Sequence, residues 1–240
     1  MLDVVVFAAH PDDAEAACGG LLVKLARLGH RTAICDLTRG EMASNGTPET
    51  RAREAQEAAR MLGLVERLQL GLPDSGLDGR DRRQVEALVR VLRAHAPRLV
   101  VAPPASSRHP DHRETSALVR RAHFFCAVRG FLPEVPPVDR PVRLRCLDWG
   151  TMRPSFVVDI TAELPTKIAA LRCYRSQFER SPGDHPTVLN DAAWIERVEI
   201  HARHYGRLAG IAAGEPYTTD APLAVHDPLA LFAAGPEVRP

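Results

Sequence analysis

The sequence predicts an α/β fold: a Rossmann-like, doubly wound and mainly parallel sheet with helices on both faces. Two short runs of β-branched and apolar residues, 4–9 and 99–102, are typical of strands buried on both faces of a parallel sheet. Similar runs alternate along the chain with segments whose apolar residues recur at helical spacing. The connections are short, which indicates right-handed crossovers between parallel strands.

The first half of the chain repeats a strand-loop-helix unit. Thr47 as N-cap and Pro48 at the first helical position predict where the second helix begins, and Gly29 and Gly63 supply left-handed stops. The predicted strands are residues 4–9, 32–37, 67–70 and 99–102. The predicted helices lie around 21–28, from 48 to 63, over 81–95, and from the 109–112 segment toward 125.

The second half has weaker signals. A Pro-rich stretch, 131–141, is expected to be a connecting loop. The elements expected after it are strands at 143–147 and 156–160 and helices at 163–174 and 192–208. We expect one domain over 1–240, with a loosely packed C-terminal tail over about 215–240, because this tail is rich in Pro and Ala and has no periodicity.

Composition excludes several classes of protein. The chain has 240 residues, 45% of them hydrophobic and 25% charged, which is typical of one globular domain with a substantial core. It has 31 basic and 30 acidic residues, so nucleic acid and anionic membrane surfaces are not expected partners. The amino terminus lacks a signal-peptide pattern and no apolar run could span a membrane, so a cytoplasmic location is expected.

Cysteine usage directs the search for a metal site to other residues. The five cysteines are odd in number, widely spaced and without a CxxC motif. This pattern argues against both a disulfide framework and a thiolate zinc site. Any metal is therefore expected to bind histidine and carboxylate groups.

Two similar tetrapeptides, HPDD at 10–13 and HPDH at 109–112, follow the first and fourth predicted strands. In a sheet of order 3-2-1-4 these strands are neighbours at the topological switch point, where ligands bind at the carboxyl ends. Two histidines and a carboxylate form the ligand set of an open catalytic zinc site. The alternative, two helix caps, explains the Asp and Pro residues but gives no reason for three histidines.

The order of motifs resembles a known family. AAHPDDAE, DLTRGE, the Arg51-x-x-Glu54-Ala pattern, GLPDSG and RHPDH are similar, in this order, to the zinc-dependent N-acetylglucosamine deacetylases of the PIG-L/LmbE family. PSFVVDI, ALRCYRSQF and HYGRLAGIAAGEPY resemble the branch that deacetylates N-acetylglucosaminyl-malate in bacillithiol biosynthesis. The Pro-rich segment 133–141 and Ala212, where an aromatic residue is expected, depart from the pattern.

The resemblance implies a role for each motif residue. The implied zinc ligands are His10, Asp13 and His112. Asp12 is implied as the general base, and His109, as a protonated imidazole, as the group that stabilises the oxyanion. Asp111 would then hold His109 in orientation. One zinc ion per chain is expected, although other divalent metals suit the same ligands.

Four further residues are candidates for binding substrate. Arg51 either binds substrate carboxylates or forms an internal salt bridge with Glu54 or another acid. Asp74 resembles the family's acceptor for sugar hydroxyl groups, or is simply a turn residue. Ser44 and Asn45 could close over the substrate, or serve only as loop residues.

The resulting hypothesis is a zinc-dependent amidohydrolase that removes acetyl from N-acetylglucosaminyl-malate. Alternative substrates are another N-acetylglucosamine derivative or the amide of a thiol conjugate. A non-catalytic zinc- or sugar-binding protein is less favoured, because it has no chemical need for Asp12 and His109. The resemblance also implies a homo-oligomer, a trimer or a hexamer.

Overall fold

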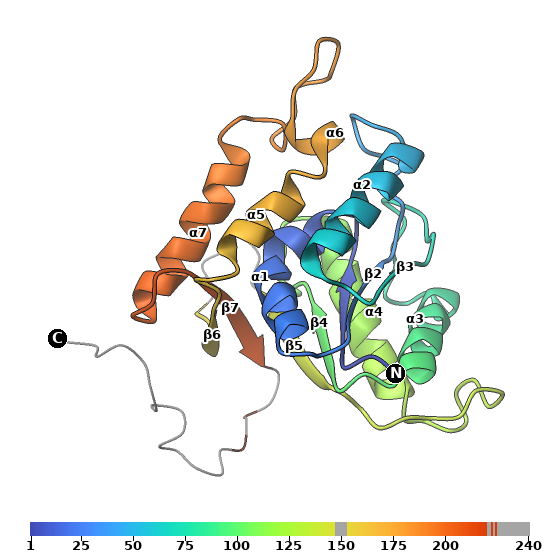
Figure 1. The fold of residues 1–240 in the computed structure, drawn as a ribbon. Coiled ribbons are helices and arrows are strands. Elements are labelled where there is room, and N and C mark those ends of the chain that lie inside the picture. Colours follow the sequence, from blue (N-terminus) through green and yellow to red (C-terminus); the bar gives the residue numbers. More distant parts are fainter. Residues whose placement is uncertain (147–152, 220–221, 223, 225–240) are drawn as a thin grey trace.

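A seven-stranded sheet in the order β3-β2-β1-β4-β5-β7-β6 forms the centre of the computed structural model, which describes residues 1–146, 153–219, 222 and 224 (Figure 1). The strands are β1 (Val4–Ala8), β2 (Thr32–Asp36), β3 (Glu66–Gln69), β4 (Leu99–Ala102), β5 (Val142–Cys146), β6 (Phe156–Asp159) and β7 (Gly214–Thr219). The helices are α1 (Asp13–Arg27), α2 (Pro48–Leu62), α3 (Arg82–His95), α4 (Pro110–Phe125), α5 (Leu164–Leu171), α6 (Arg175–Phe178) and α7 (Trp194–Leu208).

The direction of the strands confirms the predicted fold class. Strands β3, β2, β1, β4 and β5 pair in parallel, whereas β7 is antiparallel to both β5 and β6. In register, Val4 of β1 lies opposite Thr32 of β2 and Leu99 of β4. The carboxyl ends of β1 and β4 therefore lie side by side, as the predicted order 3-2-1-4 requires.

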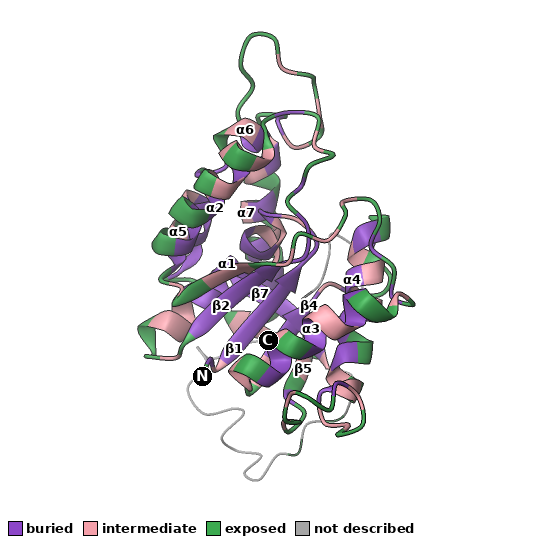
Figure 2. Ribbon diagram, turned by 90° about the vertical axis from the view of Figure 1, so that its right-hand side faces the viewer, coloured by how far each residue is buried: buried purple, intermediate pink, exposed green. Residues whose placement is uncertain are grey.

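Alternate residues of β1 enter two different cores. Val4 and Val6 pack in the core under α1, α2, α5 and α7, whereas Val5 and Phe7 pack in the core under α3 and α4. Figure 1 shows these two helical layers on opposite sides of the sheet. The strands β1 and β2 are buried along their whole length, as their purple colour in Figure 2 shows. Burial on both faces explains why the sequence of β1 is a continuous apolar run.

Local signals set most helix boundaries correctly. The Thr47 side chain accepts a hydrogen bond from the Thr50 N–H, and Gly63 ends α2 with φ 74°. The predicted helix 163–174 is wrong at its end, because α5 ends at Leu171 and the separate short helix α6 begins only at Arg175. Between the two helices, Tyr174 has non-helical dihedral angles and a fully buried side chain, so tertiary packing overrides the helical periodicity here.

The predicted loose tail is wrong at its beginning. Residues Gly214–Thr219 form β7, a buried strand inserted between β5 and β6. The GEPYTT sequence carries no apolar alternation, and its place in the sheet depends on Tyr217 and Glu215, which are both almost completely buried. The rest of the predicted tail, apart from residues 222 and 224, and the last residue of the predicted strand 143–147 lie outside the described residues.

Among the helices of the described part, none has the length and apolar character needed to cross a membrane.

Candidate metal centre

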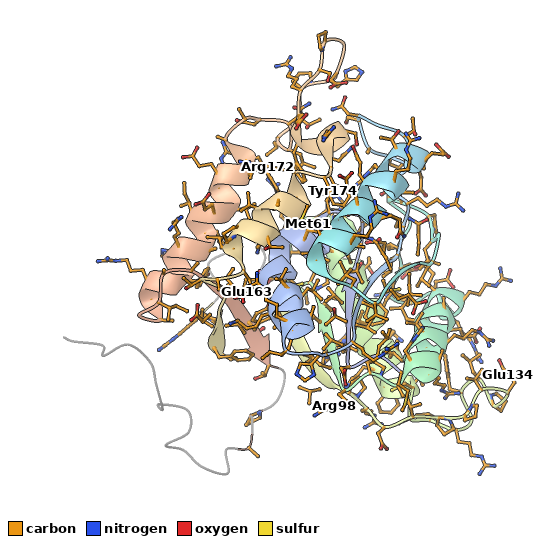
Figure 3. The ribbon with its side chains drawn as sticks, in the orientation of Figure 1. Met61, Arg98, Glu134, Glu163, Arg172 and Tyr174 are labelled. Carbon is orange, nitrogen blue, oxygen red and sulfur yellow. The ribbon has the colours of Figure 1, made fainter. Side chains whose placement is uncertain are left out.

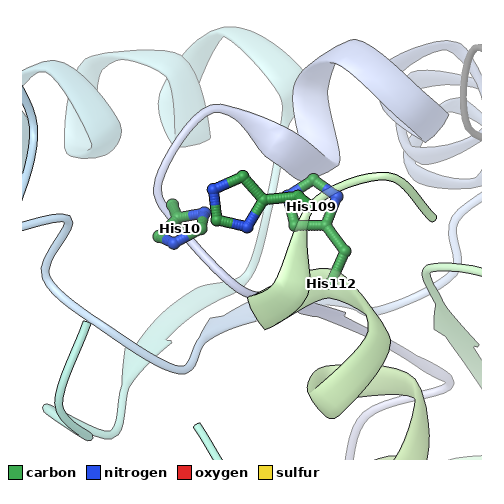
Figure 4. A group of neighbouring side chains, drawn as sticks. All are labelled: His10, His109 and His112. Carbon is green, nitrogen blue, oxygen red and sulfur yellow. The ribbon is translucent and has the colours of Figure 1, made fainter. Parts of the chain in front are cut away.

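The two HPD motifs meet at the carboxyl edge of the sheet. The first leaves β1 and enters α1, and the second forms the start of α4 just beyond β4. The ring centroid of His10 lies 4.9 Å from that of His109 and 5.7 Å from that of His112. Figure 4 shows the three imidazoles gathered between the β1–α1 loop and the first turn of α4. The predicted convergence of the two motifs is therefore present in the structure.

Asp13 joins the other two implied metal ligands. One of its oxygens, Oδ2, lies 3.3 Å from His10 Nδ1, and the other, Oδ1, lies 3.1 Å from His112 Nε2. Burial would raise the pKa of Asp13, but the two imidazoles hold it well below its usual range. Two imidazoles and an ionised carboxylate are thus brought together with the donor chemistry that zinc prefers.

The centre offers more donors than the three implied ones. Ligand atoms of His10, His109 and His112 lie within 4.8 Å of one another, and so do those of His10, Asp74 and Asp111. Such mixed nitrogen and oxygen donors suit a divalent transition metal. The residues present therefore fit a metal ion, and His10 belongs to every candidate ligand set.

His10 is surrounded by carboxylates on both sides of its ring. Its Nε2 atom lies 3.2 Å from Asp74 Oδ1 and 3.2 Å from Asp111 Oδ2. Burial would lower the pKa of His10, but hydrogen bonds to the surrounding carboxylates raise the pKa to about 12. The site therefore favours positive charge at this position, which is the electrostatic condition that a bound cation also satisfies.

The implied base, Asp12, is held in an unusual conformation by Arg51. Asp12 has φ 99°, a left-handed value that residues other than glycine seldom adopt. Arg51 Nη2 donates to Asp12 Oδ2 at 2.9 Å and to the carbonyl of Pro11 at 2.6 Å, while Nη1 donates to the carbonyl of Gly40 at 3.0 Å. Gly40 has φ 68°, and a Cβ there would overlap the Arg51 guanidinium.

The structure shows the internal salt bridge that was one of the two alternatives for Arg51. Its side chain is almost completely buried and forms an internal ion pair. The acid is Asp12 and not Glu54, whose carboxylate accepts hydrogen bonds from the backbone N–H and hydroxyl of Ser176. The guanidinium thus holds the loop that carries Asp12, and because Arg51 also lines the cavity, the binding of substrate carboxylates by this residue stays a prediction.

The environment of Asp12 suits proton transfer. Burial raises the pKa of Asp12 to about 7, although the Arg51 guanidinium opposes this shift. A carboxylate whose pKa lies near neutrality can both accept a proton and return it at physiological pH.

His109 and Asp111 differ from their predicted arrangement. The Asp111 carboxylate contacts His10 and accepts the Ser75 N–H at 2.8 Å, so it orients His10 and not His109. The backbone N–H of Asp111 donates to His109 Nδ1 at 3.2 Å. Burial and the neighbouring imidazoles lower the pKa of His109, which disfavours the protonated form that was expected. Because Nδ1 accepts a hydrogen bond, neutral His109 carries its proton on Nε2 and can still donate from that atom.

The remaining substrate candidates have unequal roles. Asp74 lines the cavity, contacts His10 and accepts the Met42 N–H at 2.9 Å, and these hydrogen bonds outweigh its burial and lower its pKa to about 2. Ser44 also lines the cavity. The side chain of Asn45 instead exchanges two hydrogen bonds with the backbone of His185, so it ties two loops together at the edge of the cavity.

The cavity itself has a volume of about 890 Å³ and extends from the metal centre to the second half of the chain. Its far wall includes Gln177 and three residues of α7: Trp194, Arg197 and His201. Sequence analysis did not predict these wall residues. The sequence does contain a pattern that could have indicated them in α7: positions 194, 197 and 201 are spaced so that they share one face of a helix.

A buried ionic network lies directly after Asp13 in α1. Arg67 pairs with Glu15 and, through two hydrogen bonds of 2.6 and 3.0 Å, with Asp36. Tyr174, labelled in Figure 3, donates to Glu15 at 2.9 Å. Burial raises the pKa of Asp36, whereas Arg67 opposes that shift. The network fixes the first turns of α1 to β2 and β3, and thereby the loop that holds Asp12 and Asp13.

Comparison with known proteins finds relatives along most of the chain. Residues 5–123 match the PIG-L family, described as GlcNAc-PI de-N-acetylase. The chain is 30% identical over 233 residues to 1D-myo-inositol 2-acetamido-2-deoxy-alpha-D-glucopyranoside deacetylase 2 of Saccharopolyspora erythraea, covering 73% of this chain and 84% of that relative. It is 26% identical over 219 residues to the probable N-acetyl-alpha-D-glucosaminyl L-malate deacetylase 2 of Bacillus cereus, covering 82% and 94% respectively.

The structure of this chain is similar to a solved structure of another protein. The crystal structure of the conserved protein TT1542 from Thermus thermophilus superposes with a TM-score of 0.86 and 38% sequence identity. The match covers 95% of this chain and 98% of that one.

Proposed function

The chain belongs to the PIG-L family of GlcNAc-PI de-N-acetylases, and on that premise we propose that it is a zinc-dependent amidohydrolase that removes the acetyl group from N-acetylglucosaminyl-malate, a step of bacillithiol biosynthesis. One observation supports the chemistry: Asp13 contacts both His10 and His112, so three side chains that could hold a metal lie next to a buried carboxylate, Asp12. N-deacetylation of an N-acetylglucosamine derivative is the reaction that this arrangement and the named relatives share.

Zinc would be held by His10, Asp13 and His112. When bound, it would supply Lewis acidity to the acetamide carbonyl and to the attacking water. Asp74 and Asp111 remain as partners of His10, and they hold the ring in orientation.

Proton transfer is the task of Asp12. Its carboxylate accepts a proton from the attacking water while the water oxygen forms a bond to the acetyl carbon. The same group then delivers the proton to the sugar nitrogen as the C–N bond breaks, releasing a free amine and acetic acid, which ionises to acetate at neutral pH. Arg51 keeps Oδ2 of Asp12 in place through the 2.9 Å contact.

His109 is placed to stabilise the negative charge that develops on the acetyl oxygen. It lines the cavity, and its Nδ1 atom is occupied by the Asp111 N–H, so its Nε2–H is the donor available to the substrate. A positioned donor of this kind is worth about 10²–10³ in kcat in acyl-transfer enzymes.

Two aglycones have support from relatives. The Bacillus cereus relative, aligned over 94% of its length, supports malate, and the bacillithiol-branch motifs in the sequence agree with it. The Saccharopolyspora erythraea relative, at 30% identity, supports an inositol aglycone as the second candidate.

Acetate release from three substrates tests the proposal. N-acetylglucosaminyl-malate, the inositol-linked counterpart and free N-acetylglucosamine are compared with metal-loaded and chelator-treated protein. We expect metal-dependent turnover with the highest kcat/KM for the malate conjugate. A higher value for the inositol conjugate would replace the malate assignment, and turnover that survives complete removal of metal would contradict the mechanism.

A further inference from the structure

The cavity wall opposite the metal centre is formed by one stripe of α7. Trp194, Arg197 and His201 are spaced three and four residues apart, and all three line the cavity. Trp194 also belongs to the hydrophobic core, together with Val198 and Ala202 of the same helix. The core-facing and cavity-facing sides of α7 therefore adjoin at Trp194, and Arg197 and His201 continue the cavity-facing side.

The acidic and basic side chains that line the cavity lie in different parts of it. Within the described residues that line it, the acidic groups are Asp12, Asp13 and Asp74, and all three belong to the metal centre or to its ion pairs. The arginines that line it are Arg51, Arg108 and Arg197. Arg51 is already paired with Asp12, which leaves Arg108 and Arg197 freer to bind a ligand.

Each of these two arginines can bind an anionic ligand, for a different reason. Arg197 Nη2 lies 3.3 Å from Asp191 Oδ2, but both side chains are about half exposed, at 53% and 47%. An exposed pair of this kind is weak, so an anionic ligand can compete for the guanidinium. For Arg108, which is exposed beside His109, no ion-pair partner occurs among the residues that the structure describes.

We infer that Arg197 and Arg108 form an anion-binding subsite for the aglycone of the substrate. The inference rests on the proposed deacetylase function and narrows its substrates to N-acetylglucosaminides whose aglycone carries a carboxylate or a phosphate. With the acetamide at the metal centre, a cavity of about 890 Å³ leaves room for a further group between the sugar and α7. Guanidinium groups bind carboxylate and phosphate oxygens in bidentate fashion, which makes them selective for such groups over neutral alcohols.

Substrates that share the sugar and differ in the aglycone test this subsite. The probes are the methyl glycoside of N-acetylglucosamine, which is neutral, its glycolate and malate glycosides, and the sugar 1-phosphate. We expect Arg197→Met to lower kcat/KM for the anionic probes by roughly tenfold, the value of one charge-assisted hydrogen bond, while the methyl glycoside changes by less than about twofold. Arg108→Met is expected to act in the same direction, and Arg197→Lys to retain most of the preference.

A matched control lies on the same helix. Arg203 pairs with Glu199 at 2.6 Å and does not line the cavity, so Arg203→Met should leave the ratio of anionic to neutral kcat/KM unchanged. An equal loss on neutral and anionic probes in both Arg197→Met and Arg108→Met, or no loss on any probe, would overturn the inference.

The wild-type protein separates this inference from the proposed function. Turnover of the methyl glycoside with no preference for any anionic probe would overturn the subsite and leave the deacetylase standing. A preference for the 1-phosphate over malate would support the subsite and remove the malate assignment. Absence of turnover on all four probes with metal-loaded protein would remove both.

Discussion

Asp12 shows how one residue depends on its neighbours. A left-handed φ of 99° costs free energy in a residue with a side chain, and it persists only where the surroundings hold it. Arg51 does so by binding both the Asp12 carboxylate and the carbonyl of the preceding residue, Pro11. The result is a carboxylate whose position is fixed independently of the implied metal ligands beside it.

Replacement of Asp12 by Asn tests its role as the base. Asn has nearly the same shape and tolerates left-handed φ values, so the loop is expected to keep its conformation. We expect kcat for acetate release to fall by about 10²–10⁴, the usual contribution of a positioned base, with metal content per chain unchanged. Full activity at normal metal content would show that another group takes the proton.

Replacement of Arg51 separates positioning from substrate binding. Because the guanidinium holds Asp12, we expect Arg51→Lys to lower kcat on the order of a hundredfold with little change in KM, as a displaced catalytic group does. Arg53 is an exposed residue of the same helix whose guanidinium donates to Thr50, and Arg53→Lys serves as the control. An increase in KM without a loss of kcat would instead support the substrate-binding role of Arg51.

Helix α1 depends on a residue almost two hundred positions away. Cys18 breaks the helix with φ −143°, which leaves N–H groups without helical partners. The Glu215 carboxylate of β7 accepts the N–H groups of Gly20 and Leu21 at 2.8 and 2.7 Å, and Lys167 of α5 balances its charge at 2.7 Å. A strand from near the end of the chain thus caps the second half of the helix that begins at Asp13.

This cap predicts a large effect on stability. In Glu215→Gln, Lys167 would keep a buried charge without a counter-ion, so we expect the free energy of unfolding to fall by about 3 kcal/mol. Urea denaturation measures the change. Glu199→Gln, which removes a carboxylate from an exposed ion pair, should change stability by less than about 0.5 kcal/mol. Equal effects of the two substitutions would contradict this account of the cap.

The segment that leads from α4 into the Pro-rich stretch is also fixed by one distant residue. The Arg93 guanidinium of α3 donates five hydrogen bonds to backbone carbonyls between residues 125 and 135. This explains how a chain segment without regular structure is held against the α3–α4 layer, on the side of the sheet opposite α7.

For the molecule as a whole, the metal should link the two HPD motifs and so stabilise the fold. Saturation with zinc at about 100 times its Kd stabilises by about 2.7 kcal/mol, which for a chain of this size corresponds to a rise in Tm of roughly 5–10 °C. Thermal melts with zinc and with chelator measure the shift. The implied ligand set predicts that Asp13→Asn abolishes most of it and that Asp74→Asn retains it. The reverse result would favour the set of His10, Asp74 and Asp111.

The fold class and the meeting of the two HPD motifs followed from the sequence alone. Continuous apolar runs identify buried parallel strands, and residues that follow neighbouring parallel strands must emerge at the same edge of the sheet. Those rules need only local patterns and a strand order, so they placed the two HPD motifs together without any knowledge of contacts, whereas the choice of His10, Asp13 and His112 within the motifs came from the family resemblance.

The tertiary structure alone decided the partners of the charged groups and the far wall of the cavity. Three features depend on contacts between residues that are distant in the sequence. They are the pairing of Arg51 with Asp12, the contact of the Asp111 carboxylate with His10, and the burial of β7. No periodicity encodes such contacts, because a charged side chain pairs with whichever opposite charge the packed elements bring within reach. The same holds for α7. Its periodicity predicts a helix, but only the packing of the whole chain shows that residues of this helix line the cavity.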